Sequence, residues 1–135
     1  MGAYLAQRDV PPSYVLCSSA RRATETLDHV LAELSERPEV HTARDLYHAG
    51  PGELLDQIRE VGDDVAALLL VGHNPGVEDL ALALAGSGDG RARRRMQSKY
   101  PTAGLAEIHF DCDRWRQVEF RGGKLRGFRT PKDLV

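Results

Sequence analysis

Apolar residues recur along the first part of the chain with spacings that alternate between those of strands and those of helices. Short apolar runs predict strands, and the longest run is nearly continuous, as expected of a strand covered on both faces. The predicted strands are Tyr14–Cys17, Val40–Ala43 and Val65–Val71. Apolar positions three and four residues apart predict amphipathic helices that follow these strands. The predicted helices are Arg21–Leu34, Gly52–Val61 and Pro75–Ala85.

The pattern changes in the C-terminal part, where short apolar segments separated by turn residues predict an antiparallel meander. Its strands are Leu105–Phe110, Trp115–Phe120 and Leu125–Phe128. Between the two parts, the small and basic residues of Gly86–Arg95 predict a loop or a short insertion. The expected architecture is an α/β fold, with a mostly parallel sheet flanked by helices and an antiparallel C-terminal meander, in one domain over residues 1–135.

Composition narrows the functions that such a fold could serve. Of the 135 residues, 41% are hydrophobic and 28% are charged, and 18 basic against 20 acidic residues give a net charge of −2. This balance argues against a generic electrostatic binder of nucleic acid or of an anionic membrane. No apolar run approaches the ~20 residues of a membrane span, and the first residues do not form a signal peptide. The two cysteines have neither metal-site nor disulfide spacing, so we expect a reducing, cytoplasmic location.

One candidate site lies where the run Val65–Val71 ends and the next helix begins. Parallel α/β sheets bind ligands at the carboxyl ends of their strands. His73 follows this strand after Gly72, with Asn74 as the expected helix cap and Pro75 at the first helical position. A helix N-terminus favours an anion, and an imidazole there can donate a hydrogen bond to phosphate or transfer a proton. The alternative is that His73 is an ordinary polar loop residue.

A second candidate site lies between the strand Tyr14–Cys17 and its helix. Ser18 or Ser19 is expected to cap the first helical turn through its side chain. Arg22 lies near the start of the same helix, where the helix dipole makes a positive charge unfavourable. Some negative group should therefore offset this arginine.

Two kinds of negative group could offset the charge of Arg22. Glu25 or Glu36 could do so as a neighbouring carboxylate in solution. A bound phosphate held by two hydrogen bonds from the guanidinium is the functional alternative. Arg21 points about 100° away around the helix and is expected to face solvent.

Together these segments resemble the histidine phosphatase superfamily, also called phosphoglycerate-mutase-like, and closely resemble its small SixA-type phosphohistidine phosphatases. The family motif of a serine, three residues and Arg-Ala matches residues 18–26, Ser-Ser-Ala-Arg-Arg-Ala-Thr-Glu-Thr. The family motif of a strand followed by Gly-His-x-Pro matches residues 68–75, Leu-Leu-Leu-Val-Gly-His-Asn-Pro. Leu46–Ala49 and Phe128–Leu134 are also similar to the bacterial members. The resemblance covers nearly the whole chain, and the short length is typical of SixA-type proteins rather than of the larger mutases.

The resemblance implies a metal-independent phosphatase of signal transduction that acts on phosphohistidine in proteins through a covalent phosphohistidine intermediate. Arg22 and His73 would bind the phosphoryl oxygens as catalytic residues, and Ser18 would either add a phosphate contact or only cap its helix. His48 and Glu53 are candidates for the general acid, although His48 could equally be an exposed loop residue. The resemblance implies no cofactor and no metal.

The resemblance also indicates the kind of partner. The implied substrate is a phosphorylated protein of the histidine-containing phosphotransfer type, or a small phosphomonoester, and phosphate or sulfate would bind at the same site. Neither a nucleic acid nor a membrane is expected as a partner.

The sequence departs from the family at its defining motif. The family begins with a strand that ends in Arg-His-Gly, whose histidine is the nucleophile and whose arginine binds phosphate, but the 135 residues contain no Arg-His dipeptide. In the family that strand lies between those matching Tyr14–Cys17 and Val65–Val71. We therefore expect the nucleophile to lie upstream of this chain, and the chain alone to be inactive and marginally stable. A misassigned start, a strand supplied by another fragment and a rearranged non-catalytic relative are the explanations left open.

Three other functions are left open. A phosphate-binding pseudoenzyme would retain Arg22 and His73 without a nucleophile. A small-molecule phosphomonoesterase of the same superfamily would differ at the substrate entrance, where Lys99 and Thr102 are candidates. A nucleic-acid binder would use the basic run at residues 91–95, but a solvated surface explains this run better because the net charge is −2 and no aromatic stacking platform accompanies it.

Overall fold

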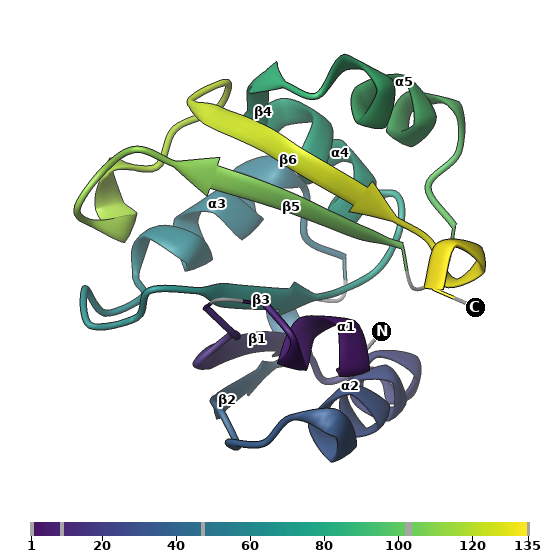
Figure 1. The fold of residues 1–135 in the computed structure, drawn as a ribbon. Helices are drawn as coiled ribbons and strands as arrows, with labels where there is room; N and C mark the ends of the chain where they lie inside the picture. The colour runs from purple at the N-terminus through teal and green to yellow at the C-terminus, as the bar shows by residue number, and fades with distance from the viewer. Residues whose placement is uncertain (1, 9, 47, 102–103, 135) are drawn as a thin grey trace. The chain divides into compact units, whose positions relative to one another are not determined.

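The computed structural model describes residues 2–8, 10–46, 48–101 and 104–134. The chain divides into two compact units, which are described separately below (Figure 1). Unit 1 comprises Met1–Ala49 and Asp64–His73, and unit 2 comprises Gly50–Asp63 and Asn74–Val135. Both units combine strands with helices, which confirms the predicted α/β class.

Unit 1 contains a parallel three-stranded sheet with the order β2-β1-β3. Its strands are β1 (Tyr14–Ser18), β2 (Glu39–Ala43) and β3 (Leu68–Val71). Cys17 of the central strand is in register with Thr42 on one side and with Val71 on the other. The three strands therefore end together, and the residues that follow β1 and β3 emerge at the same edge of the sheet.

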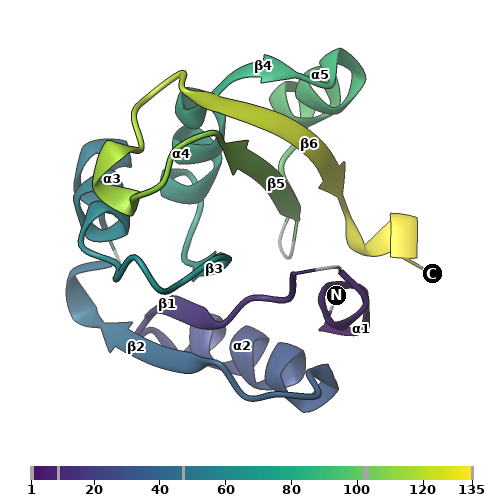
Figure 2. The same ribbon diagram turned by 60° about the vertical axis from the view of Figure 1, so that its left-hand side comes forward.

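Two helices complete unit 1, α1 (Gly2–Ala6) and α2 (Arg21–Glu33). α2 packs on one face of the sheet (Figure 2) through apolar residues with helical spacing. The buried residues of this cluster are Val15, Cys17, Ala23 and Leu27. α1 packs closely against α2, because a Cβ at Gly2 would lie 2.8 Å from the Val30 carbonyl oxygen.

Unit 2 contains a mixed three-stranded sheet with the order β4-β6-β5. Its strands are β4 (Ala85–Gly88), β5 (Leu105–Phe110) and β6 (Gly123–Arg129). β6 is parallel to β4 and antiparallel to β5. The helices of this unit are α3 (Pro51–Arg59), α4 (Gly76–Leu84) and α5 (Gly90–Ser98). Residues from α4, α5 and the sheet share one buried apolar cluster, which comprises Ala81, Ala85, Ala92, Met96, Leu125 and Phe128.

The prediction of a loop over Gly86–Arg95 is wrong, because this segment contains most of β4 and the start of α5. Small residues suit β4 because the strand runs very close to its neighbours. A Cβ at Gly86 would lie 1.7 Å from the Arg121 carbonyl oxygen, and Gly88 has a φ of 114°, which favours glycine. The basic run is helical because Asp89 caps it.

The prediction of a strand over Trp115–Phe120 is also wrong. Trp115–Gln117 forms a short 3₁₀ helix. The side chain of Gln117 stabilises it by accepting hydrogen bonds from the backbone N–H groups of Asp113 and Arg114, both at 3.2 Å. The antiparallel C-terminal part therefore consists of β5 and β6, and the third strand of that sheet, β4, is parallel.

The apolar run Val65–Val71 yields a shorter strand than predicted, because β3 begins at Leu68. All four residues of β3 are half-buried, as β3 lies at the edge of its sheet. β1 and β3 pair directly with each other in this structure. Among the described residues, no helix has the length and apolar content that crossing a membrane would require.

Candidate functional site

The candidate site lies in unit 1, where β1 and β3 end side by side. Ser18 is the last residue of β1, and His73 follows β3 after one glycine. The His73 Nε2 and Ser18 Oγ atoms are 2.8 Å apart. The structure thus joins, by a hydrogen bond, the two segments that the sequence singled out independently.

Ser18 is fully buried, with 0% of its surface exposed. Its hydroxyl oxygen accepts a hydrogen bond from the Ala20 N–H at 3.2 Å. The N-cap of α2 is Ala20, and no side chain caps the helix, so the prediction of a cap by Ser18 or Ser19 is wrong. The helix begins three residues after Ser18, and the serine therefore binds the N–H of the cap residue Ala20 instead of a helical N–H.

Arg22 is the second residue of α2 and is exposed. Arg21 faces solvent as predicted, with a side chain that is 90% exposed and an Nε atom 2.8 Å from Glu25 Oε1. Glu25 thus pairs with Arg21, and within the described part of the chain no carboxylate forms an ion pair with Arg22. Among the described residues, the Arg22 guanidinium therefore has no carboxylate partner.

The first turn of α2 adds backbone donors that the sequence did not reveal. The N–H groups of Arg21 and Arg22 meet no acceptor among the described residues, and the first turn contains no acidic residue. Unpaired N–H groups and the helix dipole make such a terminus favourable for an anion. The run Ser-Ser-Ala before the helix suggested a side-chain cap, and only the observed start at Arg21 shows that these donors are unpaired.

The start of α4 differs from that of α2. Asn74 does not cap α4 as predicted, since the N-cap is Pro75 and the Asn74 side-chain amide donates to the Tyr100 carbonyl at 3.0 Å. Asn74 lies one position too early in the chain to reach the first helical N–H groups. Glu78 and Asp79 also place negative charge in the first turn of α4. This helix start is therefore less favourable for an anion than the start of α2.

The predicted general acids occupy separate units. His48 is exposed in unit 1, shortly after a 3₁₀ helix over Arg44–Leu46, and Glu53 is exposed in the first turn of α3 in unit 2. Both stay predictions for this role. Lys99 is exposed at the C-terminal end of α5 in unit 2, while Tyr47 of the third matched segment and Thr102 lie outside the described residues.

Cys17 lies next to Ser18 in β1 and is buried. Burial, and to a lesser extent the charge of Asp28, raises the pKa of its thiol to about 11. The thiolate is the nucleophilic form of cysteine, and at neutral pH this thiol is almost entirely protonated. Cys17 is therefore a core residue of the sheet and no candidate for a nucleophile. Among the described residues no group of three or more histidine, cysteine or acidic side chains could hold a metal ion.

Comparison with known proteins finds relatives by sequence and solved structures by fold. No protein-family model matches the chain. The chain is 39% identical over 119 residues to the uncharacterized protein ML1117 of Mycobacterium leprae, covering 87% of this chain and 71% of that protein. It is 40% identical over 120 residues to the uncharacterized protein Rv1276c of Mycobacterium tuberculosis, covering 87% of this chain and 73% of that protein.

Three solved structures share the fold. A protein of Nakamurella multipartitia with the provisional name phosphohistidine phosphatase SixA superposes with a TM-score of 0.81 at 22% identity, over 96% of this chain and 77% of that one. A protein of Agrobacterium tumefaciens with the same provisional name gives a TM-score of 0.73 at 25% identity, over 96% and 75%. A protein histidine phosphatase SixA complexed with tungstate gives a TM-score of 0.75 at 20% identity, over 99% and 78%.

These matches define the class, because the fold is that of the SixA phosphohistidine phosphatases within the histidine phosphatase superfamily. This confirms the resemblance that the sequence motifs indicated. Within that class, the chain belongs to the same family as the mycobacterial proteins ML1117 and Rv1276c.

Proposed function

We propose that this protein is a phosphatase that removes the phosphoryl group from phosphohistidine in proteins. The observation that carries the proposal is the site in unit 1. There His73, which follows β3, is hydrogen-bonded to Ser18 at the end of the central strand β1, shortly before α2 begins. At that helix start the Arg22 guanidinium and two backbone N–H groups are unpaired among the described residues. These are the groups that bind the oxygens of a phosphoryl group in many proteins.

The proposed chemistry follows from the charge that develops during phosphoryl transfer. That charge is spread over the three equatorial oxygens, so the protein contributes mainly positioning and electrostatic stabilisation. Arg22 would bind two of these oxygens through its planar guanidinium, and His73 would donate a hydrogen bond to the same group. The tungstate in one SixA structure supports this proposal, because tungstate is a tetrahedral oxyanion like phosphate.

The proposal includes a covalent intermediate. A histidine nitrogen would attack phosphorus in line, the imidazole of the substrate would leave with a proton from His48 or Glu53, and water would then release phosphate from the enzyme. The nucleophilic histidine would come from a segment encoded upstream of the 135 residues, which contain no Arg-His dipeptide. The chain matches 71% and 73% of the lengths of its relatives.

Oxyanion binding by the 135-residue chain tests the site without requiring a nucleophile. Tungstate or inorganic phosphate is titrated by calorimetry against the natural chain and two variants. Arg22→Ala is expected to weaken binding by roughly tenfold or more, because a charge-assisted hydrogen bond is lost. Arg21→Ala is the matched control, as Arg21 pairs with Glu25 and faces solvent, and it should leave the affinity nearly unchanged. Equal losses in both variants, or no loss in either, would remove Arg22 from the site.

Turnover tests the chemistry. A chain extended upstream to an in-frame Arg-His-Gly segment should hydrolyse a phosphohistidine protein in the presence of a chelator, and His73→Ala should lower kcat/KM by about 10² or more. The absence of an Arg-His dipeptide favours one second candidate, a phosphate-binding protein without catalysis. Tight tungstate binding with no turnover by the extended chain would support that candidate. Faster hydrolysis of small phosphomonoesters than of phosphohistidine would instead indicate a phosphomonoesterase.

A further inference from the structure

Ser18 differs from every other described polar residue because it is the only one that is buried. A buried hydroxyl cannot reach a ligand in solvent without a rearrangement of the residues around it. Its oxygen accepts from the Ala20 N–H at 3.2 Å and lies 2.8 Å from His73 Nε2. These two contacts indicate that Ser18 acts on the site through His73 and not by direct contact with phosphate.

The direction of the Ser18–His73 hydrogen bond follows from an account of donors and acceptors. A serine hydroxyl has one hydrogen to donate and two lone pairs that accept. The Ala20 N–H uses one lone pair, so the hydroxyl hydrogen needs an acceptor of its own. Within the described chain, His73 Nε2 is the one acceptor that this hydrogen meets. A buried O–H group without an acceptor is unfavourable, so the serine donates to Nε2.

We propose that Ser18 is a positioning residue that fixes both the orientation and the tautomer of His73. A neutral imidazole whose Nε2 accepts a hydrogen bond carries its proton on Nδ1. His73 is then set as a hydrogen-bond donor through Nδ1. The proposal rests on the function proposed above, in which His73 donates to a phosphoryl oxygen. It gives Ser18 an indirect role, which differs from both the phosphate contact and the helix cap that the sequence left open.

This arrangement lowers the cost of binding an oxyanion. A donor that is already oriented needs no rotation and no proton shift when the ligand arrives. The serine is itself held in place by the Ala20 N–H at the start of α2, the same helix that carries Arg22. The hydrogen bonds therefore connect the orientation of His73 to the helix start at which the anion would bind.

Imidazole nitrogen NMR on the 135-residue chain tests the tautomer directly. Long-range ¹H–¹⁵N spectra resolve the ring nitrogens of the five histidines, and a His73→Gln variant identifies those of His73 by their disappearance. We expect a protonated Nδ1 and an unprotonated Nε2 at neutral pH. A proton on Nε2 of the natural chain would overturn the proposal without any serine variant.

A pair of serine variants tests the cause of that tautomer. Ser18→Ala should shift the His73 nitrogens toward the mixed tautomers of a solvated imidazole, whereas Ser19→Ala should leave them unchanged because Ser19 is exposed. Ser18→Ala should also weaken tungstate binding by about tenfold, the usual effect of one lost hydrogen bond. Unchanged nitrogen shifts, or changed shifts with unchanged tungstate affinity, would overturn the positioning role. A natural chain that binds no tungstate would refute the proposed function, while the nitrogen shifts would still decide whether Ser18 sets the tautomer.

Discussion

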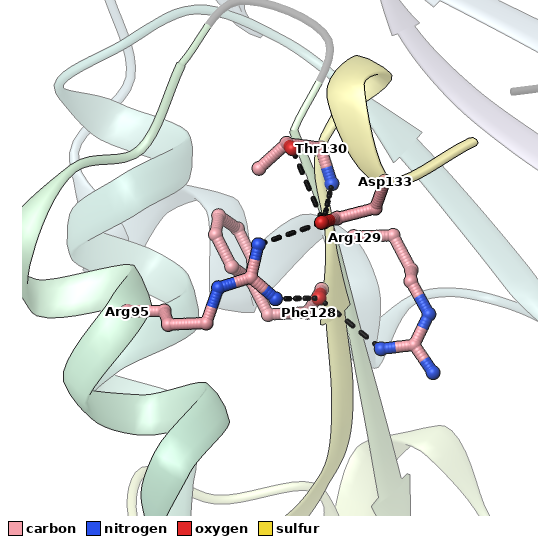
Figure 3. Close-up of polar contacts among 5 residues, drawn as sticks. All are labelled: Arg95, Phe128, Arg129, Thr130 and Asp133. Carbon is pink, nitrogen blue, oxygen red and sulfur yellow. Dashed lines mark hydrogen bonds and ion pairs between the residues drawn. The ribbon is translucent and has the colours of Figure 1, made fainter. Parts of the chain in front are cut away.

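At the scale of single residues, the carboxylate of Asp133 in unit 2 accepts several hydrogen bonds through one oxygen atom (Figure 3). Its Oδ2 atom accepts from Arg95 Nη2 at 2.7 Å, from the Thr130 N–H at 2.7 Å and from the Thr130 hydroxyl at 3.1 Å. Arg95 also donates to the Phe128 carbonyl at 3.2 Å and lies over the Phe128 ring, 5.6 Å from its centre. One arginine of α5 therefore binds both β6 and the C-terminal 3₁₀ helix over Pro131–Leu134.

These contacts make the stability of the protein depend on the charge of Asp133. Hydrogen bonds from Arg95 and then from the Thr130 N–H lower the pKa of this carboxyl to about 2. A lowered folded-state pKa means that the stabilisation is complete above the ordinary pKa of about 3.8 and is lost as the pH falls toward 2. Asp133→Asn should therefore be less stable than the natural chain at pH 7, and the difference should shrink as the pH falls below 4.

Urea unfolding of both chains between pH 7 and pH 3 measures this difference. Asp111→Asn is the matched control, because Asp111 is exposed and its carboxyl takes part in no hydrogen bond among the described residues. A deficit of the Asp133 variant that stays constant over the whole pH range would show that its charge is not the cause.

At the scale of the elements, α5 depends on its cap. Asp89 is the N-cap, and its Oδ1 atom accepts from the N–H groups of Arg91 at 3.0 Å and Ala92 at 3.1 Å. Replacing an N-cap aspartate with alanine usually costs about 1 kcal/mol. Asp89→Ala should lower the free energy of unfolding by that amount, and Asp89→Asn should lower it much less because asparagine also caps well. Equal losses in equilibrium urea unfolding would assign the effect to charge instead of capping.

This cap shows why some elements could be predicted from the sequence and others could not. β1 and α2 follow from local apolar periodicity, and the structure gives them nearly the predicted bounds. The segment over β4 and α5 is rich in glycine, serine and arginine, which by composition indicates a loop. Its strand exists because glycines allow a close approach to β6 and Arg121, and its helix exists because Asp89 caps it while Ala92 and Met96 are buried. The close approach and the burial are tertiary contacts, which the spacing of hydrophobic residues does not reveal. The cap is a local contact, and hydrophobic spacing does not reveal it either.

The candidate site could likewise be predicted from the sequence only in part. Arg22 and His73 could be singled out because each follows a predicted strand at its carboxyl end. The hydrogen bond between Ser18 and His73 could not, because it depends on β1 and β3 being neighbours although 49 residues separate Ser18 from the start of β3 at Leu68. Which strands pair is a non-local property of the fold.

At the scale of the whole molecule, the 18 basic and 20 acidic residues nearly balance. The net charge is −2, so the protein as a whole does not attract polyanions. The run at residues 91–95 is a local concentration of positive charge, but two of its four arginines bind other groups of the protein. Arg93 donates to the Ala85 carbonyl, and Arg95 binds Phe128 and Asp133. The other two arginines of this run, Arg91 and Arg94, are exposed.

Two exposed arginines on one helix are too few to bind a nucleic acid against an unfavourable net charge, because affinity for the phosphate backbone grows with the number of phosphates neutralised. We expect no saturable binding of duplex DNA or single-stranded RNA at ~0.15 M salt, measured by fluorescence anisotropy up to micromolar protein. At low salt any weak binding should fall steeply as salt is added and should disappear in the Arg91→Ala, Arg94→Ala double variant. Salt-resistant nucleic-acid binding that survives the double substitution would contradict this expectation and would require a recognition surface other than α5.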